Sequence, residues 1–441
     1  MSEIRNYIQS HRDEMIELLR ELVAVPSVQG DAAEGAPFGK EPARALRIML
    51  EKCSELGFSV ENVDNYAGSA DFGQAPQLGI LSHLDVVPEG TGWKGDPFVL
   101  REENGRLIGR GTCDDKGPAV AALFALRAVK ELGIPLKKGV RLIFGTNEEN
   151  GSADLAYYRT KRELPPMVFT PDGEYPVINA EKGMIRIRFS APFAVGDVTH
   201  QQAHNLISVH GGTVINAVPE SCDFYMSVPD VGSPSMITAK VPGRSAHAST
   251  PEKGDNAITK YLASIGKFVT DPPLDRLAQL FPHGETNGKS CGIALSDEVS
   301  GETTCVLSML DTEGARLTGA IDVRFPISFT SAEVKAKICG KLNEAGFDID
   351  SAECSEPHFT DENSPFVQTL LRVYEKVTGD HGRAIAIGGG TYVHDIPGGV
   401  AFGAEFPGHS GNMHAAEEFI TIDDLLKNAE IMAEAIVELC S

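Results

Sequence analysis

With 441 residues, the chain is too long for one compact core and long enough for two domains that each bury an apolar interior. Its formal net charge is −23 and it has no long basic run, which excludes nucleic acid and anionic membrane surfaces as expected partners and favours small molecules. Eight cysteines without close pairs, a polar N-terminus and the lack of an apolar span of transmembrane length predict a cytoplasmic protein. We expect a monomer or a homodimer.

Helical patterns open the chain. Apolar residues at close to helical spacing predict one amphipathic helix over residues 4–25, which Pro26 ends. A second helix is predicted over about 42–56, with Gly57 as its C-terminal stop, and the strand-like segment FSVENV follows. From this point the pattern becomes α/β.

Three continuous apolar runs are typical of strands buried on both faces, namely LGILS (78–82), VRLIFGT (140–146) and PMVFTPD (166–172). Between the first two, residues 119–133 predict a crossover helix, with Pro118 in its first turn. This succession predicts a mostly parallel, mixed sheet between helices. In such sheets, ligands gather at the carboxyl ends of the strands.

After Gly183, alternation of apolar and polar residues predicts antiparallel strands with one wetted face. The predicted elements are strands in MIRIRFSA (184–191), VIN (214–216), CDFYMSV (222–228) and ITAKV (237–241), a helix over 255–269, a loop-rich insertion from about 271 to 301, strands over 303–314 and 315–328, a helix near 332–345 and a strand over 347–353. Near Ser364 the α/β pattern returns. Its predicted elements are a helix over 365–379, strands within 383–392 and 398–406, and a last helix over 421–439.

Five of these segments end an apolar run with a residue type that binds metal ions. The five residues are His83, Asp114, Glu149, Asp172 and His414. Imidazole nitrogen and carboxylate oxygen suit zinc or manganese, and two such ions close together can clamp and activate one water molecule. The pattern therefore predicts a hydrolase with two divalent ions per chain, Zn²⁺ first, with Mn²⁺ or Co²⁺ as alternatives.

The position of His414 decides the domain organisation. Because it belongs with ligands from the first part of the chain, we predict one metal-binding catalytic domain from residues 1–183 and 363–441. Residues 184–362 are then an inserted α+β lid domain with an antiparallel sheet.

Each motif alone has a plainer interpretation. A single His-x-Asp such as His83 and Asp85 is common on surfaces, and Asp114 and Asp115 could equally favour the start of the following helix. Cys113 is interpreted as a small apolar filler, since no second cysteine or activating histidine lies nearby in the sequence. The motifs occur in order, after the right kind of strand, and together they favour a metal centre.

At this point the sequence resembles the co-catalytic metallopeptidases that include carboxypeptidase G, succinyl-diaminopimelate desuccinylase, aminoacylase and carnosinase. The resemblance rests on HLDVVP, GRGTCDDKGP, NEENGS, PDGEYPVINAEKG, GGTVINAVPE, GRSAHASTPEKGDNA, DVRFP and GGGTYV, and covers nearly the whole chain. It is strongest to the bacterial dipeptidase V branch of Xaa-His and β-Ala-Xaa dipeptidases. It implies a phosphorylase/hydrolase-like catalytic domain in the α/β class.

The resemblance also implies roles for single residues at the metals. His83 and Asp172 would bind one metal ion, Glu149 and His414 the other, and Asp114 would bridge them. Glu148 would be the general base, and Asp85 would orient a ligand.

In the lid, His247 and Asn216 would hold the scissile carbonyl oxygen, and Arg324 would grip the substrate carboxylate. Gly389, Gly390 and Thr391 would bind the substrate backbone, although His394 and the lead-in to His414 depart from the family pattern.

The function expected from this resemblance is a dipeptidase that cleaves dipeptides with a free amino terminus and a free carboxylate, by a hydroxide bridged between two metals. The rival is an N-acyl-amino acid deacylase with the same centre. In the family, an aspartate such as Asp172 goes with peptidases that accept a free amino terminus, whereas deacylases usually carry glutamate. A binding module that has lost activity would need a missing ligand or base, and none is missing.

Overall fold

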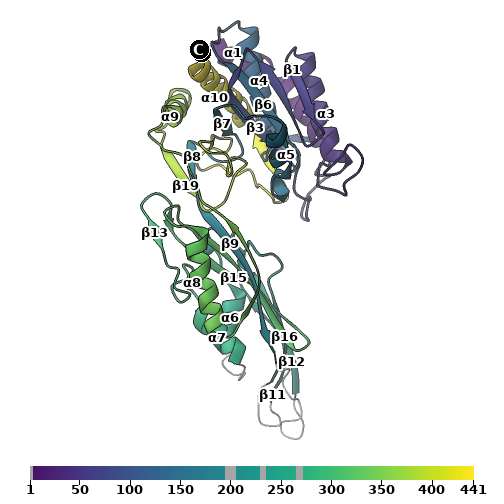
Figure 1. Cartoon of the computed structure of the whole chain (residues 1–441). Coiled ribbons are helices and arrows are strands. Elements are labelled where there is room, and N and C mark those ends of the chain that lie inside the picture. Colours follow the sequence, from purple (N-terminus) through teal and green to yellow (C-terminus); the bar gives the residue numbers. More distant parts are fainter. Residues whose placement is uncertain (1–2, 194–204, 229–234, 265–271) are drawn as a thin grey trace. The chain divides into compact units, whose positions relative to one another are not determined.

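The computed structural model describes residues 3–193, 205–228, 235–264 and 272–441 (Figure 1). The chain divides into two compact units. Unit 1 comprises Met1–Asn179, Phe359–Ile385 and Thr391–Ser441, and unit 2 comprises Ala180–His358 and Ala386–Gly390. The limits predicted for a catalytic domain and a lid remain a prediction.

The centre of unit 1 is a mixed sheet with parallel strands in its middle. The strand order is β1 (Ser59–Val63), β2 (Ala67–Phe72), β6 (Gly139–Gly145), β3 (Pro76–His83), β7 (Met167–Thr170), β20 (Val400–Ala401), β8 (Val177–Glu181) and β18 (His358–Phe359), with β19 (Ala384–Ile387) paired to β8. Strands β6, β3, β7 and β20 run parallel to one another, whereas the pairs β1–β2, β2–β6 and β20–β8 are antiparallel. The predicted α/β class is therefore confirmed.

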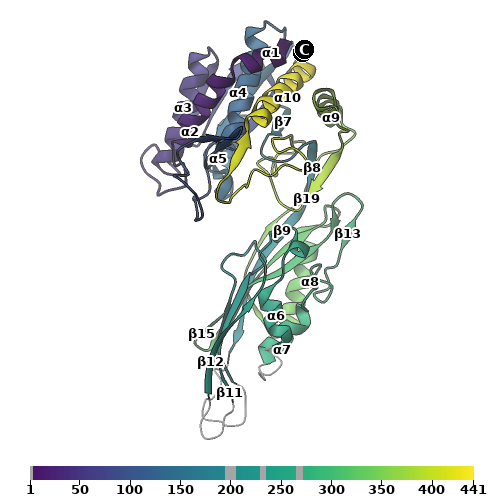
Figure 2. The ribbon, with the colours of Figure 1, turned by 180° about the vertical axis from the view of Figure 1, so that it is seen from behind.

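Helices cover both faces of this sheet (Figures 1 and 2). Successive residues of β3 point to opposite faces, so Ile80 joins the core under α4 (Lys116–Glu131) and α10 (Ile422–Cys440), while Leu81 joins the core under α5 (Ala153–Lys161). The other helices of unit 1 are α1 (Glu3–Ser10), α2 (Arg12–Val23), α3 (Lys40–Glu55) and α9 (Pro365–Thr378). A small sheet has the order β21 (Phe419–Thr421), β5 (Arg106–Ile108) and β4 (Arg101–Glu103).

Unit 2 is built on an antiparallel sheet, as predicted. Its order is β12 (Ser235–Pro242), β11 (Ser221–Val228), β10 (Asn205–Gly211), β15 (Thr304–Glu313), β16 (Arg316–Phe325), β9 (Gly183–Pro192) and β17 (Asp348–Ser355). A separate apolar core joins this sheet to α6 (Ala257–Ser264), α7 (Pro272–Leu280) and α8 (Ser331–Glu344). A ribbon of β13 (Ser296–Asp297) and β14 (Gly301–Glu302) completes the unit. Helix α8 begins where its sequence indicates, because Thr330 and Glu333 form a reciprocal capping box.

Two local predictions are wrong. The single helix predicted over 4–25 is two helices, because the N–H of His11 bonds to the carbonyl of Ile8 in a tighter turn and its backbone (φ −106°, ψ 14°) leaves the helical region. Residues 214–216 form a turn instead of a strand. The insertion predicted over about 271–301 is loop-rich after its first helix, α7. The helix predicted over 255–269 is α6, and its last predicted turn lies outside the described residues.

Within the described ranges, no helix combines the length and the apolar character required to cross a bilayer.

Candidate active site

Three parallel strands of unit 1 deliver polar side chains to one edge of its sheet. Strand β3 ends at His83, β6 leads into the 3₁₀ turn η1 (Glu148–Asn150), and β7 is followed by Asp172. Because β6, β3 and β7 are adjacent and parallel, their carboxyl ends meet at the same edge. The sheet topology therefore gathers these residues, although they lie far apart in the sequence.

Asp114 occupies the middle of the group. One of its carboxylate oxygens, Oδ1, lies 2.9 Å from Nε2 of His83, and the other, Oδ2, lies 2.9 Å from Nε2 of His414. Nε2 of His414 also lies 3.2 Å from Oε2 of Glu149. One carboxylate thus faces two imidazoles from different segments, which is the geometry that a bridging ligand requires.

The remaining two acidic residues, Glu148 and Asp172, also lie near His83. Ligand atoms of His83, Glu148 and Asp172 lie within 4.8 Å of one another, as do those of His83, Asp114 and Glu149. The five predicted metal ligands and the predicted base therefore form one cluster. His83 belongs to both of its halves.

Asp85 holds the turn that carries both glutamates. It is fully buried, and its two carboxylate oxygens accept the backbone N–H groups of Glu148 and Glu149, each at 3.1 Å. Its own carbonyl oxygen lies 3.0 Å from Nδ1 of His83, a contact that orients the ring so that Nε2 faces Asp114. Asp85 thus positions three members of the cluster.

Asp115 holds the end of β3. It stands at the N-cap position of α4, but its side chain makes no capping bond. Instead, Oδ2 accepts the backbone N–H of His83 at 3.1 Å.

A buried ion pair holds the loop that carries Asp114. Glu418 and Arg110 are each 1% exposed, and their side chains meet at 2.7 Å. The second oxygen of Glu418 accepts the backbone N–H groups of Gly111, Cys113 and Asp114 at 3.0, 2.9 and 3.2 Å. Glu418 therefore fixes the loop in the conformation that presents Asp114.

Neither Glu418 nor Arg110 stands out in the sequence. The two residues lie 308 positions apart in the chain, so no local pattern joins them. The available signal was a glutamate four residues after His414 in a motif that already supplied a ligand.

A second buried hydrogen-bond network, centred on Asp154, could not be recognised in the sequence either. Asp154, buried at the start of α5, accepts the N–H groups of Thr146 and Asn147 at 2.6 and 2.8 Å and the hydroxyl of Tyr392 at 2.6 Å. This network supports the segment between β6 and Glu148. In the sequence, Asp154 is one more acidic residue in an ordinary helical pattern.

The acidic residues of the cluster repel one another in a buried setting. Burial raises the pKa of Glu148 well above its usual range, and the charge of Asp172 adds to this effect. Burial and the charge of Asp114 raise the pKa of Asp172 to about 7 and also raise the pKa of Glu149. A positive charge placed nearby would stabilise the ionised form of these carboxyl groups.

The pKa values of the two histidines are raised as well, which for an imidazole favours the charged form. Hydrogen bonds to Asp114 and Glu149 raise the pKa of His414 to about 11. Burial lowers the pKa of His83, but its bonds to Asp114 and Asp85 outweigh that effect and leave the pKa well above the usual value. For Asp114, burial is likewise outweighed, by the bonds to His414 and His83, and its pKa is lowered.

These residues fit divalent cations. Nitrogen and oxygen ligands bound at about 2.0–2.2 Å to one ion lie roughly 3–4 Å apart, and the closest ligand atoms here are 2.9–3.2 Å apart. Within the described part of the chain, no lysine or arginine pairs with Glu148, Glu149 or Asp172, so divalent ions would supply the missing positive charge. His414 has a left-handed backbone (φ 59°), which is uncommon for a residue other than glycine and clusters at functional sites.

The predicted lid residues Asn216, His247 and Arg324 fall in unit 2. Gly389 and Gly390, predicted in the catalytic domain, also fall in unit 2, whereas Thr391 is buried in unit 1. The N–H of Ala248 bonds to the carbonyl of Asn216 at 2.9 Å, and Ala217 and His247 form a β-bridge. Nδ1 of the exposed His247 lies 2.7 Å from the hydroxyl of Ser249. Asn216 and His247 are therefore on adjoining segments.

Arg324 and the glycine loop extend the same neighbourhood. The Arg324 guanidinium donates to the carbonyl of Gly388 at 3.2 Å, and a Cβ on Gly388 would approach Cβ of Ser249 to 2.6 Å. Gly389 has open space where a Cβ would stand. The structure thus brings Arg324 and this loop to the segment that carries His247.

The Arg324 side chain is already bound within unit 2. It is 5% exposed, and its Nε and Nη2 donate to the two oxygens of the buried Asp322 at 2.6 and 3.0 Å. Its binding of a substrate carboxylate stays a prediction, because Asp322 already accepts two of its hydrogen bonds.

Known proteins that are similar to this chain identify its family. Residues 79–438 match the peptidase family M20/M25/M40. The Beta-Ala-Xaa dipeptidase of Lactobacillus delbrueckii subsp. lactis is 34% identical over 98% of this chain and 97% of its own length.

Solved structures share the fold at lower identity. Human carnosine dipeptidase 1 aligns with a TM-score of 0.64 and 16% identity over 99% of this chain and 98% of its own. The aminoacylhistidine dipeptidase of Vibrio alginolyticus aligns with a TM-score of 0.62 and 15% identity over 96% of both chains.

Proposed function

The chain belongs to the peptidase family M20/M25/M40, and on this premise we propose that it is a metal-dependent dipeptidase whose substrates have a free amino terminus and a free carboxylate. The observation that carries the proposal is the position of Asp114, whose two oxygens face His83 and His414. The similarity over the full length to a Beta-Ala-Xaa dipeptidase supports the substrate class.

His83 and Asp172 would hold one divalent ion, Glu149 and His414 the other, and Asp114 would contact both. Bound there, the two ions would polarise the scissile carbonyl and lower the pKa of the attacking water held between them. Zn²⁺ is the first candidate, with Mn²⁺ or Co²⁺ as alternatives, because all three accept imidazole and carboxylate ligands.

Glu148 would act as the general base. Its carboxyl group lies in the cluster but has no arginine or lysine partner within the described residues, and burial raises its pKa, which makes the carboxylate a stronger base. It would accept a proton from the water and deliver it to the leaving amine. Asp85, bound to the N–H of Glu148, keeps this base at its position.

In unit 2, His247 and Asn216 would donate hydrogen bonds to the carbonyl oxygen, where each donor of this kind is worth a few kcal/mol in the transition state. Arg324, Gly389, Gly390 and Thr391 would bind the rest of the substrate. The adjoining segments of Asn216 and His247, and the bond from Arg324 to Gly388, support this division of labour.

A direct comparison of substrates tests the proposal. The metal-loaded protein is assayed with β-alanyl-histidine, with a panel of α-dipeptides and with N-acetyl and N-succinyl amino acids. We expect kcat/KM for dipeptides to exceed that for N-acyl amino acids at least a hundredfold, since Asp172 stands where the family's deacylases usually carry glutamate. The reverse preference would replace the dipeptidase by the deacylase. Glu148→Gln is the control for a contaminating hydrolase.

A cytoplasmic location and a monomeric or dimeric state complete the proposal. All eight cysteines are free thiols in the structure, which supports a reducing compartment.

A further inference from the structure

A cavity lies in unit 1, outside the metal cluster. Its volume is about 330 Å³, and its walls come from β5, β21, the start of α10 and the loop over 404–411. None of the proposed metal ligands lines it. Cavities that bind small ligands start near this size, at roughly 300 Å³.

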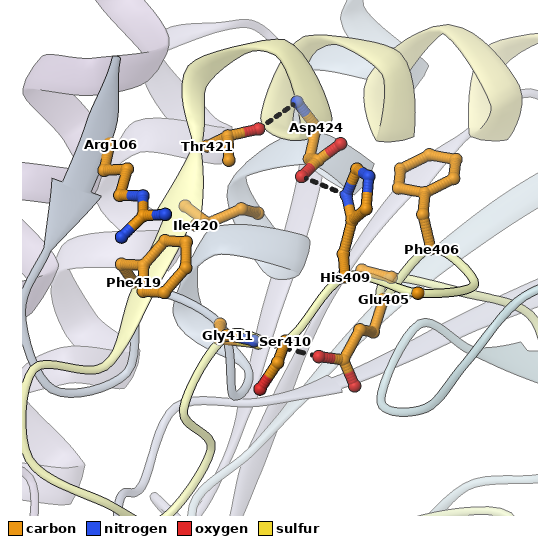
Figure 3. Close-up of a pocket in the computed structure, with 13 residues that line it drawn as sticks. Arg106, Glu405, Phe406, His409, Ser410, Gly411, Phe419, Ile420, Thr421 and Asp424 are labelled. Atoms are coloured by element: carbon orange, nitrogen blue, oxygen red, sulfur yellow. Dashed lines mark hydrogen bonds and ion pairs between the residues drawn. The ribbon is translucent and has the colours of Figure 1, made fainter. Parts of the chain in front are cut away.

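One end of the cavity is acidic (Figure 3). Oε1 of the half-buried Glu405 accepts the N–H of Gly411 at 2.9 Å, and Oδ2 of Asp424 lies 3.0 Å from Nδ1 of His409. Across the described segments, no lysine or arginine forms an ion pair with Glu405, and burial raises the pKa of this carboxyl group, with the charges of Glu174 and Asp424 adding to the shift. At this end the His409 imidazole thus partners Asp424, whereas Glu405 has no lysine or arginine partner among the described residues.

The other end carries a cation. The guanidinium of Arg106 lies 4.2 Å over the ring of Phe419, and within the described residues it has no ion pair with a carboxylate. In Figure 3, Arg106 and Phe419 stand on the side of the cavity opposite to His409 and Glu405. A planar guanidinium that is held by a ring and lacks a carboxylate partner is suited to bind one.

Apolar side chains separate the two ends. Ile420 and Phe406 are 6% and 8% exposed and line the cavity together with Phe419. A ligand that satisfies all three features has an ammonium group, a carboxylate and an apolar side chain.

We infer that this cavity is a binding site for a small zwitterion with an apolar side chain, such as a free amino acid, separate from the metal centre. The carboxylate would meet Arg106, the ammonium would meet Glu405, and the side chain would pack on Phe406, Phe419 and Ile420. This site does not depend on the proposed function, because none of its contacts uses a metal ligand. It does adjoin the metal centre, since its walls include Cys113, which precedes Asp114, and Gly411, three residues before His414.

Equilibrium dialysis of the metal-loaded protein with radiolabelled L-leucine tests this inference. Two variants each remove one charge: Arg106→Gln, and Glu405→Gln, whose amide oxygen can still accept the N–H of Gly411. Arg44→Gln, which changes an exposed arginine on α3, is the matched control. We expect leucine to bind the parent and the control, and each charge variant to weaken this binding at least tenfold, a change that corresponds to about 1.4 kcal/mol.

The two charge variants separate this site from the active site, where product amino acids would also bind, because neither Arg106 nor Glu405 is a proposed metal ligand or substrate contact. Competition tests whether the cavity recognises both charges of the ligand. N-acetyl-L-leucine lacks the ammonium charge and L-leucinamide lacks the carboxylate, so each should displace labelled leucine from the cavity at least tenfold less well than leucine does. Leucine binding that is absent from the parent, or unchanged in Arg106→Gln, would overturn the inference. So would equal displacement by all three compounds. If Glu405→Gln does not fold, as judged by circular dichroism, Arg106→Gln alone decides, because Arg106 is an exposed residue.

Discussion

Replacing Asp85 by asparagine tests whether a single buried carboxylate positions the turn that carries Glu148 and Glu149. Both oxygens of Asp85 accept backbone N–H groups at 3.1 Å, and asparagine keeps only one oxygen. One N–H would then face an NH₂ donor, and an unsatisfied buried donor costs about 1–3 kcal/mol. Because the glutamates would lose their fixed position, metal affinity should fall about 10–100-fold, the usual effect of losing a residue that orients metal ligands.

The free energy of unfolding of metal-depleted Asp85→Asn is measured in urea, and its metal affinity by competition with a chromogenic chelator. Asp71→Asn is the matched control, since Asp71 pairs with Arg141 at 2.7 and 2.8 Å on β2 but contacts no predicted ligand. The control should keep its metal affinity within about twofold. Parent-like metal affinity in Asp85→Asn would refute the positioning role of Asp85.

Three further predictions concern the base, the substrate carboxylate and the support of the glutamate turn. Glu148→Gln should keep its metal ions and lose about 10²–10⁴ in kcat, because an amide cannot accept the proton, whereas Glu149→Gln should lose metal affinity; the opposite pattern in kinetics and metal analysis would exchange their roles. If Arg324 grips the substrate carboxylate, the C-terminal amide of a dipeptide should be hydrolysed at least tenfold more slowly than the dipeptide, and equal rates would reject that grip. In Gly145→Ala, the new Cβ would stand 1.7 Å from the hydroxyl oxygen of Tyr392, so urea unfolding should show a loss of about 1–3 kcal/mol, while Gly340→Ala, with open space around its Cβ, should show none.

Part of the cluster could be predicted from the sequence, because residues that directly follow parallel strands lie at one edge of the sheet. His83, Glu149 and Asp172 each follow an apolar run that the structure has as β3, β6 or β7. Because parallel strands end at one edge, the pattern placed these residues together without knowledge of their distances. Asp114 and His414 lie in loops, whose paths the strand pattern does not predict. Their place in the cluster was predicted only from the order of the motifs and from the family resemblance.

The supporting contacts could not be predicted, because they join segments that no local pattern relates. The Glu418–Arg110 ion pair is one case, and the break between α1 and α2 at His11 is another. The apolar spacing over 4–23 is the same for one helix or two, so only the backbone of His11 reveals the break. Arg324 and Asp322 lie two residues apart on one strand, where side chains point to the same face, but the sequence does not show that the two side chains pair.

Measurement of dipeptide hydrolysis against the number of metal equivalents bound tests the central claim most directly. The chelated protein is titrated with Zn²⁺, and in parallel with Mn²⁺ and Co²⁺, while bound metal is quantified by mass spectrometry. A centre in which Asp114 contacts two ions predicts that hydrolysis rises with the second equivalent and saturates near two per chain. Full hydrolysis at one equivalent, or none at two, would contradict the proposed function.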